Sequence, residues 1–338
     1  MKIQTKKTLN EYQQSLTYDD ISLIPTEVSR IKSRREADTS CEFLGEKLSL
    51  PVLSSPMESV TGIEMAKELS KLSCLGILNR FDSSLKKILK NQKENHQIKA
   101  VSIALNSPMN LIEKLAEGNY LICIDTANAN NQEVLKKTEE IKKNFNTKVI
   151  VGNIAHGASL KQLEDAGADA VRVGIGSGSV CTTSIQTGIG IGQVSSLLNV
   201  FFARKKDNLK IKIIADGGIK GSGDAAKAIA VGADAVMLGR LLAGTRETPG
   251  EVIKYDDQLW KKYRGSASFG VKMKNEFIEG EETMVPYKGV VQSVIDGISD
   301  GLKSTMSYMN CLTLEELCKK DAFAILSESS YLERLPKK

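Results

Sequence analysis

One pattern occurs eight times along this chain: a short apolar run that predicts a β-strand, followed by a segment with helical periodicity. Runs rich in Val, Ile and Leu indicate strands that are buried on both faces, as in a parallel sheet. Parallel neighbours need a crossover connection, which is usually a helix. We expect the strands within residues 50–57, 75–80, 98–105, 120–127, 147–155, 169–176, 211–218 and 234–240.

Eight such units in 338 residues favour the α/β class and, within it, a (β/α)8 TIM barrel. An open, doubly wound sheet is the alternative. That fold would place a glycine-rich dinucleotide motif after its first strand, whereas GIGSGS follows the sixth strand here. The barrel is therefore the favoured architecture.

We expect a single barrel domain over residues 1–338. Residues 1–49 lack a strong period and are predicted to be an N-terminal extension that covers the bottom of the barrel or contacts a neighbouring protein. After the eighth strand, residues 269–285 are predicted to form a short flap. Residues 308–338 are predicted to form a C-terminal tail with a short helix.

Composition excludes several classes of function. No apolar stretch reaches the roughly 18 residues of a membrane helix, and the N-terminus lacks the apolar core of a signal peptide. We therefore expect a cytoplasmic protein with no membrane partner. The net charge of +5 is spread along the chain, which argues against nucleic acid as a partner. The six cysteines form no CxxC pair and there are only two histidines, so no zinc site is indicated.

Active residues of a barrel of this class lie beyond the carboxyl ends of its strands, and the loops after strands 7 and 8 often bind phosphate. Polar residues and glycines gather at these positions here. They are Ser55, Met57, Asn79, Arg80, Asp125, Asn153, the loop 174–193, Asp216, Gly217, Gly218, Gly239 and Arg240.

The glycine-rich loop after the sixth strand holds Cys181. Backbone amides of such a loop could stabilise a thiolate nucleophile, but a buried structural cysteine is the alternative. Asp125 and Asp216 could hold ribose hydroxyls or could cap the helices that follow them. His156 could be a general base or simply an exposed residue. Cys74 lies within an apolar run and is expected to be buried.

Several segments together resemble the IMP dehydrogenase/GMP reductase family. They are LTYDDISLIP, SSPMESVT, VGIGSGSVCTT, IIADGGIKGSGDAAKAIAVGADAVMLGRLLAGT, KKYRGSAS and VPYKG. The resemblance is collinear and covers nearly the whole chain. It implies a (β/α)8 barrel that forms a homotetramer, binds a purine 5′-nucleotide (GMP or IMP) and uses a nicotinamide dinucleotide.

The resemblance also implies roles for particular residues. Cys181 would attack C2 of the purine, while Thr183 and Glu279 would move protons of the incoming or departing group. The nucleotide would be held by Ser55, Met57, Ser179, Asp216, Gly218, Gly239, Arg240, Tyr263, Gly265, Ser266 and Ala267. The nicotinamide cofactor would lie against Asp125, Thr126, Ala127 and Asn153. Backbone carbonyls of Gly176, Gly178 and Cys181 would bind a monovalent cation such as K⁺.

Within the family, the sequence favours reduction of GMP. The CBS pair that most IMP dehydrogenases insert after the second strand is missing, and residues 81–98 are expected to form one helix. Only FGVKMKNEFI separates YRGSAS from EGEE, so there is no Arg-Tyr pair to activate water, and IDTANAN resembles the reductases. Two segments point the other way: LAGTRETPGE resembles the dehydrogenases, and CTTS departs from the usual CTTR or CTTK.

We therefore expect a GMP reductase activity, in which GMP and NADPH give IMP, NADP⁺ and ammonia through a thioimidate on Cys181. One alternative is an IMP dehydrogenase that converts IMP, NAD⁺ and water to XMP. Another is a purine nucleotide sensor without turnover. The choice between NADPH and NADH, the cation and the state of assembly stay open at this stage.

Overall fold

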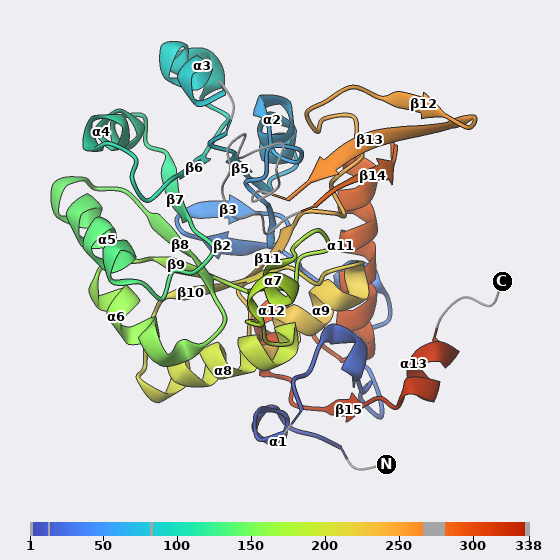
Figure 1. Ribbon diagram of the computed structural model, residues 1–338. Helices are drawn as coiled ribbons and strands as arrows, with labels where there is room; N and C mark the ends of the chain where they lie inside the picture. The colour runs from blue at the N-terminus through green and yellow to red at the C-terminus, as the bar shows by residue number, and fades with distance from the viewer. Residues whose placement is uncertain (1–2, 13, 82–83, 266–280, 335–338) are drawn as a thin grey trace.

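The computed structural model describes residues 3–12, 14–81, 84–265 and 281–334. Eight parallel strands close into a barrel in the order β10-β11-β4-β5-β6-β7-β8-β9, as predicted (Figure 1). Each strand lies inside its expected range. The strands are β4 (Val52–Ser54), β5 (Leu75–Leu78), β6 (Ala100–Ile103), β7 (Leu121–Asp125), β8 (Val149–Ile154), β9 (Ala170–Val173), β10 (Lys212–Asp216) and β11 (Ala235–Leu238).

Helices surround the barrel and connect its strands (Figure 1). They are α2 (Ile63–Lys71), α3 (Ser84–Lys90), α4 (Met109–Glu117), α5 (Gln132–Asn144), α6 (Leu160–Asp165), α8 (Gln193–Lys206), α9 (Ser222–Val231) and α11 (Val291–Tyr308). The single helix expected over 81–98 is wrong in detail. Helix α3 ends at Lys90, Asn91 leaves the helical region with φ −128° and ψ 56°, and a 3-10 turn, η3 (Gln92–Asn95), follows. Asparagine is a weak helix former, so an end at this position is reasonable.

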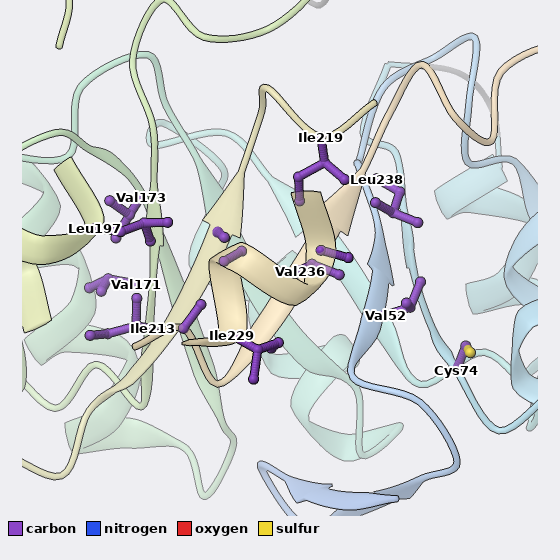
Figure 2. Close-up of a cluster of buried hydrophobic side chains, with 14 of the residues drawn as sticks. Val52, Cys74, Val171, Val173, Leu197, Ile213, Ile219, Ile229, Val236 and Leu238 are labelled. Atoms are coloured by element: carbon purple, nitrogen blue, oxygen red, sulfur yellow. The ribbon is translucent and has the colours of Figure 1, made fainter. Parts of the chain in front are cut away.

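The apolar strands serve two cores because successive side chains point to opposite faces. Ile213 of β10 packs outward into the layer shared with the helices, whereas Ile214 packs into the barrel interior. Figure 2 shows the outer layer, in which Leu197 of α8 and Ile229 of α9 approach the side chains of β9, β10 and β11. Burial on both faces explains why the strands read as continuous apolar runs.

A hairpin of the N-terminal extension closes the bottom of the barrel. Strands β2 (Cys41–Phe43) and β3 (Glu46–Leu48) pair antiparallel through a turn at Leu44 and Gly45, which both have positive φ. Phe43 and Leu48 are buried in the interior cluster. They pack with the first residues of several barrel strands, so the hairpin plugs the end opposite the strand carboxyl termini.

The two ends of the described chain also pair with each other. Strand β1 (Ile21–Leu23) forms an antiparallel ladder with β15 (Phe323–Ile325). The remaining short helices are α1 (Lys6–Asn10), α7 (Thr183–Thr187), α12 (Leu314–Lys319) and α13 (Glu328–Glu333), with the 3-10 turns η1 (Tyr18–Asp20), η2 (Arg34–Glu36) and η4 (Gly157–Ser159). No helix in the described part of the chain is both long and apolar enough to cross a bilayer.

After β11 the chain forms a separate three-stranded antiparallel sheet (Figure 1). Its strands are β12 (Ile253–Tyr255), β13 (Gln258–Arg264) and β14 (Glu282–Pro286). The predicted flap, 269–285, therefore ends within β14, while its residues up to 280 lie outside the described part of the chain.

Phe43→Ala is expected to lower the free energy of unfolding by about 3–5 kcal/mol, because it leaves a cavity in the interior cluster at the bottom of the barrel. Glu42→Ala, an exposed position of the same strand, should change it by less than about 0.5 kcal/mol. Urea unfolding followed by circular dichroism measures both. Equal stability of the two variants would show that the hairpin does not contribute to the core.

Candidate active site

Two adjoining cavities open at the carboxyl ends of the barrel strands. The larger, of about 390 Å³, is lined by Cys181 and is called the Cys181 cavity below. The second, of about 290 Å³, is lined by Arg240 and is called the Arg240 cavity. Both are lined by Ser55, Met57, Ser177, Gly178, Asp216, Gly217 and Tyr263. Because these walls are shared, the two cavities form one continuous groove.

The loop between β9 and α7 brings Cys181 to this groove. Gly174, with φ +144°, passes so close to the backbone of Asp216 that a Cβ there would overlap the Asp216 carbonyl oxygen. The loop closes on itself where the Cys181 N–H donates to the Gly178 carbonyl at 3.1 Å. From the far side, the N–H of Glu281 donates to the Val180 carbonyl at 3.1 Å. The end of the post-barrel excursion therefore touches the cysteine loop directly.

Cys181 is partly exposed and lies beside a hydroxyl group. Its Sγ donates to Oγ1 of Thr183 at 3.2 Å. By contrast, Cys74 and Cys123 are buried, and burial raises the pKa of the first thiol to about 12 and of the second to about 11. A raised pKa keeps a thiol protonated near neutral pH, and the burial of Cys74 confirms the prediction from its apolar run. Of these three cysteines, Cys181 is the one that lines the cavity, which keeps it as the candidate nucleophile.

A buried guanidinium lines the Cys181 cavity and joins two of its carboxylates. Arg172 of β9 donates from Nη1 to Oδ1 of Asp125 at 2.7 Å and from Nη2 to Oδ2 of Asp216 at 2.8 Å. Oδ2 of Asp216 also accepts hydrogen bonds from Arg172 Nε at 3.0 Å and from Asn153 Nδ2 at 2.8 Å. Burial opposes the charge of Arg172, but the carboxylates of Asp216 and Asp125 outweigh it and raise the pKa of its guanidinium above the ordinary value. The two carboxylates are therefore held by a permanent cation.

This network excludes the helix-capping alternative for the two aspartates. The N-cap of α5 is Asn131 and the N-cap of α9 is Gly221. Asp125 instead also pairs with Arg80, whose Nε lies 3.3 Å from Oδ2. Both carboxylates thus face the Cys181 cavity rather than the helices that follow them.

Arg172 is the site residue that sequence reasoning missed. The strand that contains Arg172 was predicted correctly, but no role in the site was predicted for its charged side chain. A signal was present, because an arginine in a strand buried on both faces must find acidic partners. Which acids it finds depends on the neighbouring strands β7 and β10.

The wall of the Arg240 cavity is built from distant segments of the chain. The Ser179 hydroxyl lies 3.5 Å from the Tyr263 hydroxyl, which lies 3.9 Å from Met57 Sδ. Gly239 faces the same hydroxyl, and a Cβ there would lie 3.2 Å from the Tyr263 oxygen. Burial raises the pKa of Tyr263, so its hydroxyl remains a neutral hydrogen-bond donor. Gly218, with φ +76°, completes a wall of small and hydroxyl-bearing residues.

Most of the predicted site residues line this groove. The Cys181 cavity collects Ser55, Met57, Asp125, Thr126, Ala127, Asn153, Gly176, Gly178, Cys181, Thr183, Asp216, Tyr263 and Gly265. The Arg240 cavity adds Ser179, Gly218, Gly239 and Arg240. Ser266, Ala267 and Glu279 lie outside the described residues. His156 lines neither cavity. It caps η4 instead, where its Nδ1 accepts a hydrogen bond from the N–H of Ala158.

The chain is similar to known proteins over most of its length. The family model described as the IMP dehydrogenase / GMP reductase domain matches residues 15–337. A GMP reductase of Streptococcus gordonii is 37% identical over 93% of this chain and 95% of its own length. A GMP reductase of Lactobacillus acidophilus is 36% identical over 87% of this chain and 90% of its own length. An inosine-5′-monophosphate dehydrogenase of Aquifex aeolicus is 43% identical, but over 64% of this chain and 46% of its own length.

Arg172→Met is expected to lower the free energy of unfolding by about 3 kcal/mol or more, because it leaves two carboxylates, whose side chains are only 11% and 14% exposed, without their shared cation. Arg80→Met removes one ion pair from a side chain that is 27% exposed and should cost about 1 kcal/mol or less. Denaturant unfolding compares the two. Similar losses for both variants would contradict the central role of Arg172.

Proposed function

Because this chain belongs to the IMP dehydrogenase/GMP reductase family, we propose that it is a GMP reductase. In this reaction GMP, NADPH and one proton give IMP, NADP⁺ and ammonia. The observation that carries the proposal is the Cys181–Thr183 pair at the carboxyl end of the barrel, in a chain that matches GMP reductases over nearly their whole length.

The groove has the shape and chemistry that a purine 5′-nucleotide needs. Its phosphate would lie in the Arg240 cavity against Ser179, Gly218, Gly239, Arg240 and Tyr263. Asp216 stands where the two cavities meet, which suits a carboxylate that accepts hydrogen bonds from ribose hydroxyls. The base would then enter the Cys181 cavity near Ser55, Met57 and Gly265, together with Ser266 and Ala267.

Cys181 supplies the nucleophile. Its thiolate adds to C2 of the guanine, and the C2–N bond breaks as the amino group leaves as ammonia. The departing amino group needs a proton, which Thr183 passes on from Glu279. A reduced nicotinamide held beside Asp125 and Asn153 would supply the hydride that C2 receives. Cys181 then leaves C2 as a thiolate, which completes the cycle and releases IMP.

The nicotinamide cofactor has a place next to this thiol. Asp125, Thr126, Ala127 and Asn153 line the side of the Cys181 cavity away from the Arg240 cavity. The carboxylate and amide side chains are suited to hydroxyl and amide groups of a dinucleotide. We propose NADPH rather than NADH as the physiological reductant.

Three further properties are proposed. The carbonyls of Gly176, Gly178 and Cys181 are proposed to bind K⁺. The protein is proposed to be a cytoplasmic homotetramer, and Tyr255 and Leu259, which are exposed on the β12–β13 hairpin, supply apolar surface for subunit contacts. Size-exclusion chromatography with light scattering measures the assembly directly.

IMP dehydrogenation is the second candidate, because the same thiol could attack IMP. The segment LAGTRETPGE favours it, because this segment resembles the dehydrogenases. The partial match to the dehydrogenase of Aquifex aeolicus, over 46% of its length, does not extend to a full-length relationship. The two activities differ in the direction of hydride transfer and are separated by one assay.

The purified protein is expected to oxidise NADPH when GMP is added, with release of IMP and ammonia. Absorbance at 340 nm and chromatography of the nucleotides measure this reaction. Formation of XMP from IMP and NAD⁺, with no IMP formed from GMP and NADPH, would instead identify a dehydrogenase. Binding of both nucleotides without any turnover would indicate a sensor.

Cys181→Ala is expected to abolish turnover while GMP binding stays within about tenfold, because the thiol makes the reacting bond and the phosphate wall is intact. Thr183→Val should lower kcat by about 10²–10⁴-fold, the usual contribution of proton transfer. Thr183→Ser keeps the hydroxyl and serves as the matched control. Full activity of Thr183→Val would remove the hydroxyl from the mechanism.

A further inference from the structure

Met57 and Gly265 both line the Cys181 cavity but come from separate parts of the fold. Met57 belongs to the loop after the barrel strand β4, whereas Gly265 directly follows β13 of the three-stranded sheet. The base of the nucleotide is proposed to lie near both residues, so their relative position sets where C2 lies. Their neighbours in the sequence, Glu58 and Arg264, form an ion pair, with 3.3 Å between Oε2 and Nη2.

The loop after β4 is tied to the barrel by several hydrogen bonds. The N–H of Ser55 donates to the Leu238 carbonyl at 3.0 Å, and the Thr61 hydroxyl donates to the Ser55 carbonyl at 2.6 Å. The N–H groups of Val60 and Thr61 both donate to the Met57 carbonyl at 3.0 Å. This loop is therefore a fixed reference against which the end of β13 is placed.

Arg264 attaches the end of β13 to that loop in two ways. Its backbone N–H donates to the Ser59 hydroxyl at 3.0 Å, and this hydroxyl donates to the Arg264 carbonyl at 3.2 Å. Its guanidinium pairs with Glu58 and also lies 3.9 Å from Oε2 of Glu282, on β14. The backbone and the side chain of one residue thus fix the three-stranded sheet against the loop after β4.

The same attachment extends to the cysteine loop. The N–H of Gly265 donates to the Glu281 carbonyl at 3.0 Å, and the N–H of Glu281 donates to the Val180 carbonyl at 3.1 Å. Val180 directly precedes Cys181 in the sequence. A series of hydrogen bonds and peptide bonds therefore runs from the loop after β4, through Arg264, to the residue before the nucleophile.

We propose that Arg264 is a positioning residue, which acts through Glu58 to set the distance between C2 of the bound purine and Sγ of Cys181. This inference rests on the proposed function for the position of the base. The side chains of Arg264 and Glu58 are 27% and 28% exposed, and ion pairs exposed to this extent contribute little to stability. The rate of reaction between bound groups, by contrast, falls steeply when the reacting atoms are misplaced. Loss of the pair should therefore slow the reaction at Cys181 while the protein stays folded.

A 2-chloropurine nucleoside 5′-monophosphate tests the inference without any need for hydride transfer. The Cys181 thiolate adds to C2 and chloride leaves, so that a C–S bond replaces the C–Cl bond. The rate of this modification at saturation, kinact, reports the geometry of the reacting atoms. The half-saturating concentration, KI, reports binding. Mass spectrometry of the intact protein over time measures both constants.

Arg264→Met is expected to lower kinact about tenfold or more and to change KI less than about threefold, because the phosphate wall is intact. Arg264→Lys keeps the charge and should recover part of the rate. Lys262→Met is the matched control, because it removes an exposed cation of the same strand, which pairs with the other oxygen of Glu282. It should change neither constant, and the urea midpoints of all variants should match that of the wild type.

Glu58→Gln removes the charge of the partner and should lower kinact to a similar extent. The double variant should be no slower than Arg264→Met, because two residues that act through one contact do not have additive effects. Additive losses would show that the two side chains act separately and would overturn the inference. An unchanged kinact in Arg264→Met, whatever happens to KI, would overturn it as well.

This inference and the proposed function fail separately. A wild-type protein that reduces GMP, with unaltered modification of Arg264→Met, retains the proposed function and loses the positioning role. Slow modification of Arg264→Met, in a protein whose wild type reduces no GMP, retains the positioning role and loses the proposed reaction.

Discussion

The mouth of the barrel depends on one buried cation. Arg172 reaches from β9 to Asp125 on β7 and to Asp216 on β10, so that three strands are joined by charged hydrogen bonds beneath the groove. Without it, two carboxylates would face each other in a region with little water, where like charges repel strongly. The strand between them makes room for this side chain: a Cβ on Gly152 of β8 would lie 2.5 Å from the Arg172 Cβ. A glycine in the interior of a strand normally weakens it, and here the missing side chain leaves space for the aliphatic part of Arg172.

Small residues at the same end of the barrel serve a second purpose, which is to bring backbones together. Gly174 lets the cysteine loop touch the end of β10, and Gly239 lets the Tyr263 hydroxyl approach the end of β11. The thiol and the hydroxyl wall therefore belong to loops whose positions follow from rigid strands. A groove built in this way is largely preformed, which lowers the cost of ordering it when a ligand binds.

The charges divide the groove into two chemically different halves. Beside Cys181, the cations of Arg172 and Arg80 are matched by the carboxylates of Asp125 and Asp216, which leaves a highly polar wall without net charge. Around Arg240 and Lys288 the cations face solvent and lack acidic partners among the described residues. A purine nucleotide has the same asymmetry, with a neutral base at one end and phosphate at the other. The groove thus favours one orientation of its ligand, with the base toward the thiol.

The sequence by itself determined the barrel, the eight strands and most residues of the groove, because strand periodicity and strand ends are local features. The resemblance to a known family then added chemical roles for Cys181 and Thr183. Tertiary structure alone decided which distant groups meet: the partners of Arg172, the closing of the barrel by Phe43, and the ladder between β1 and β15. These contacts join segments far apart in the chain, and a local pattern carries no information about the partner. Arg172 shows this most clearly, since its position in a strand was evident but its two carboxylates were not.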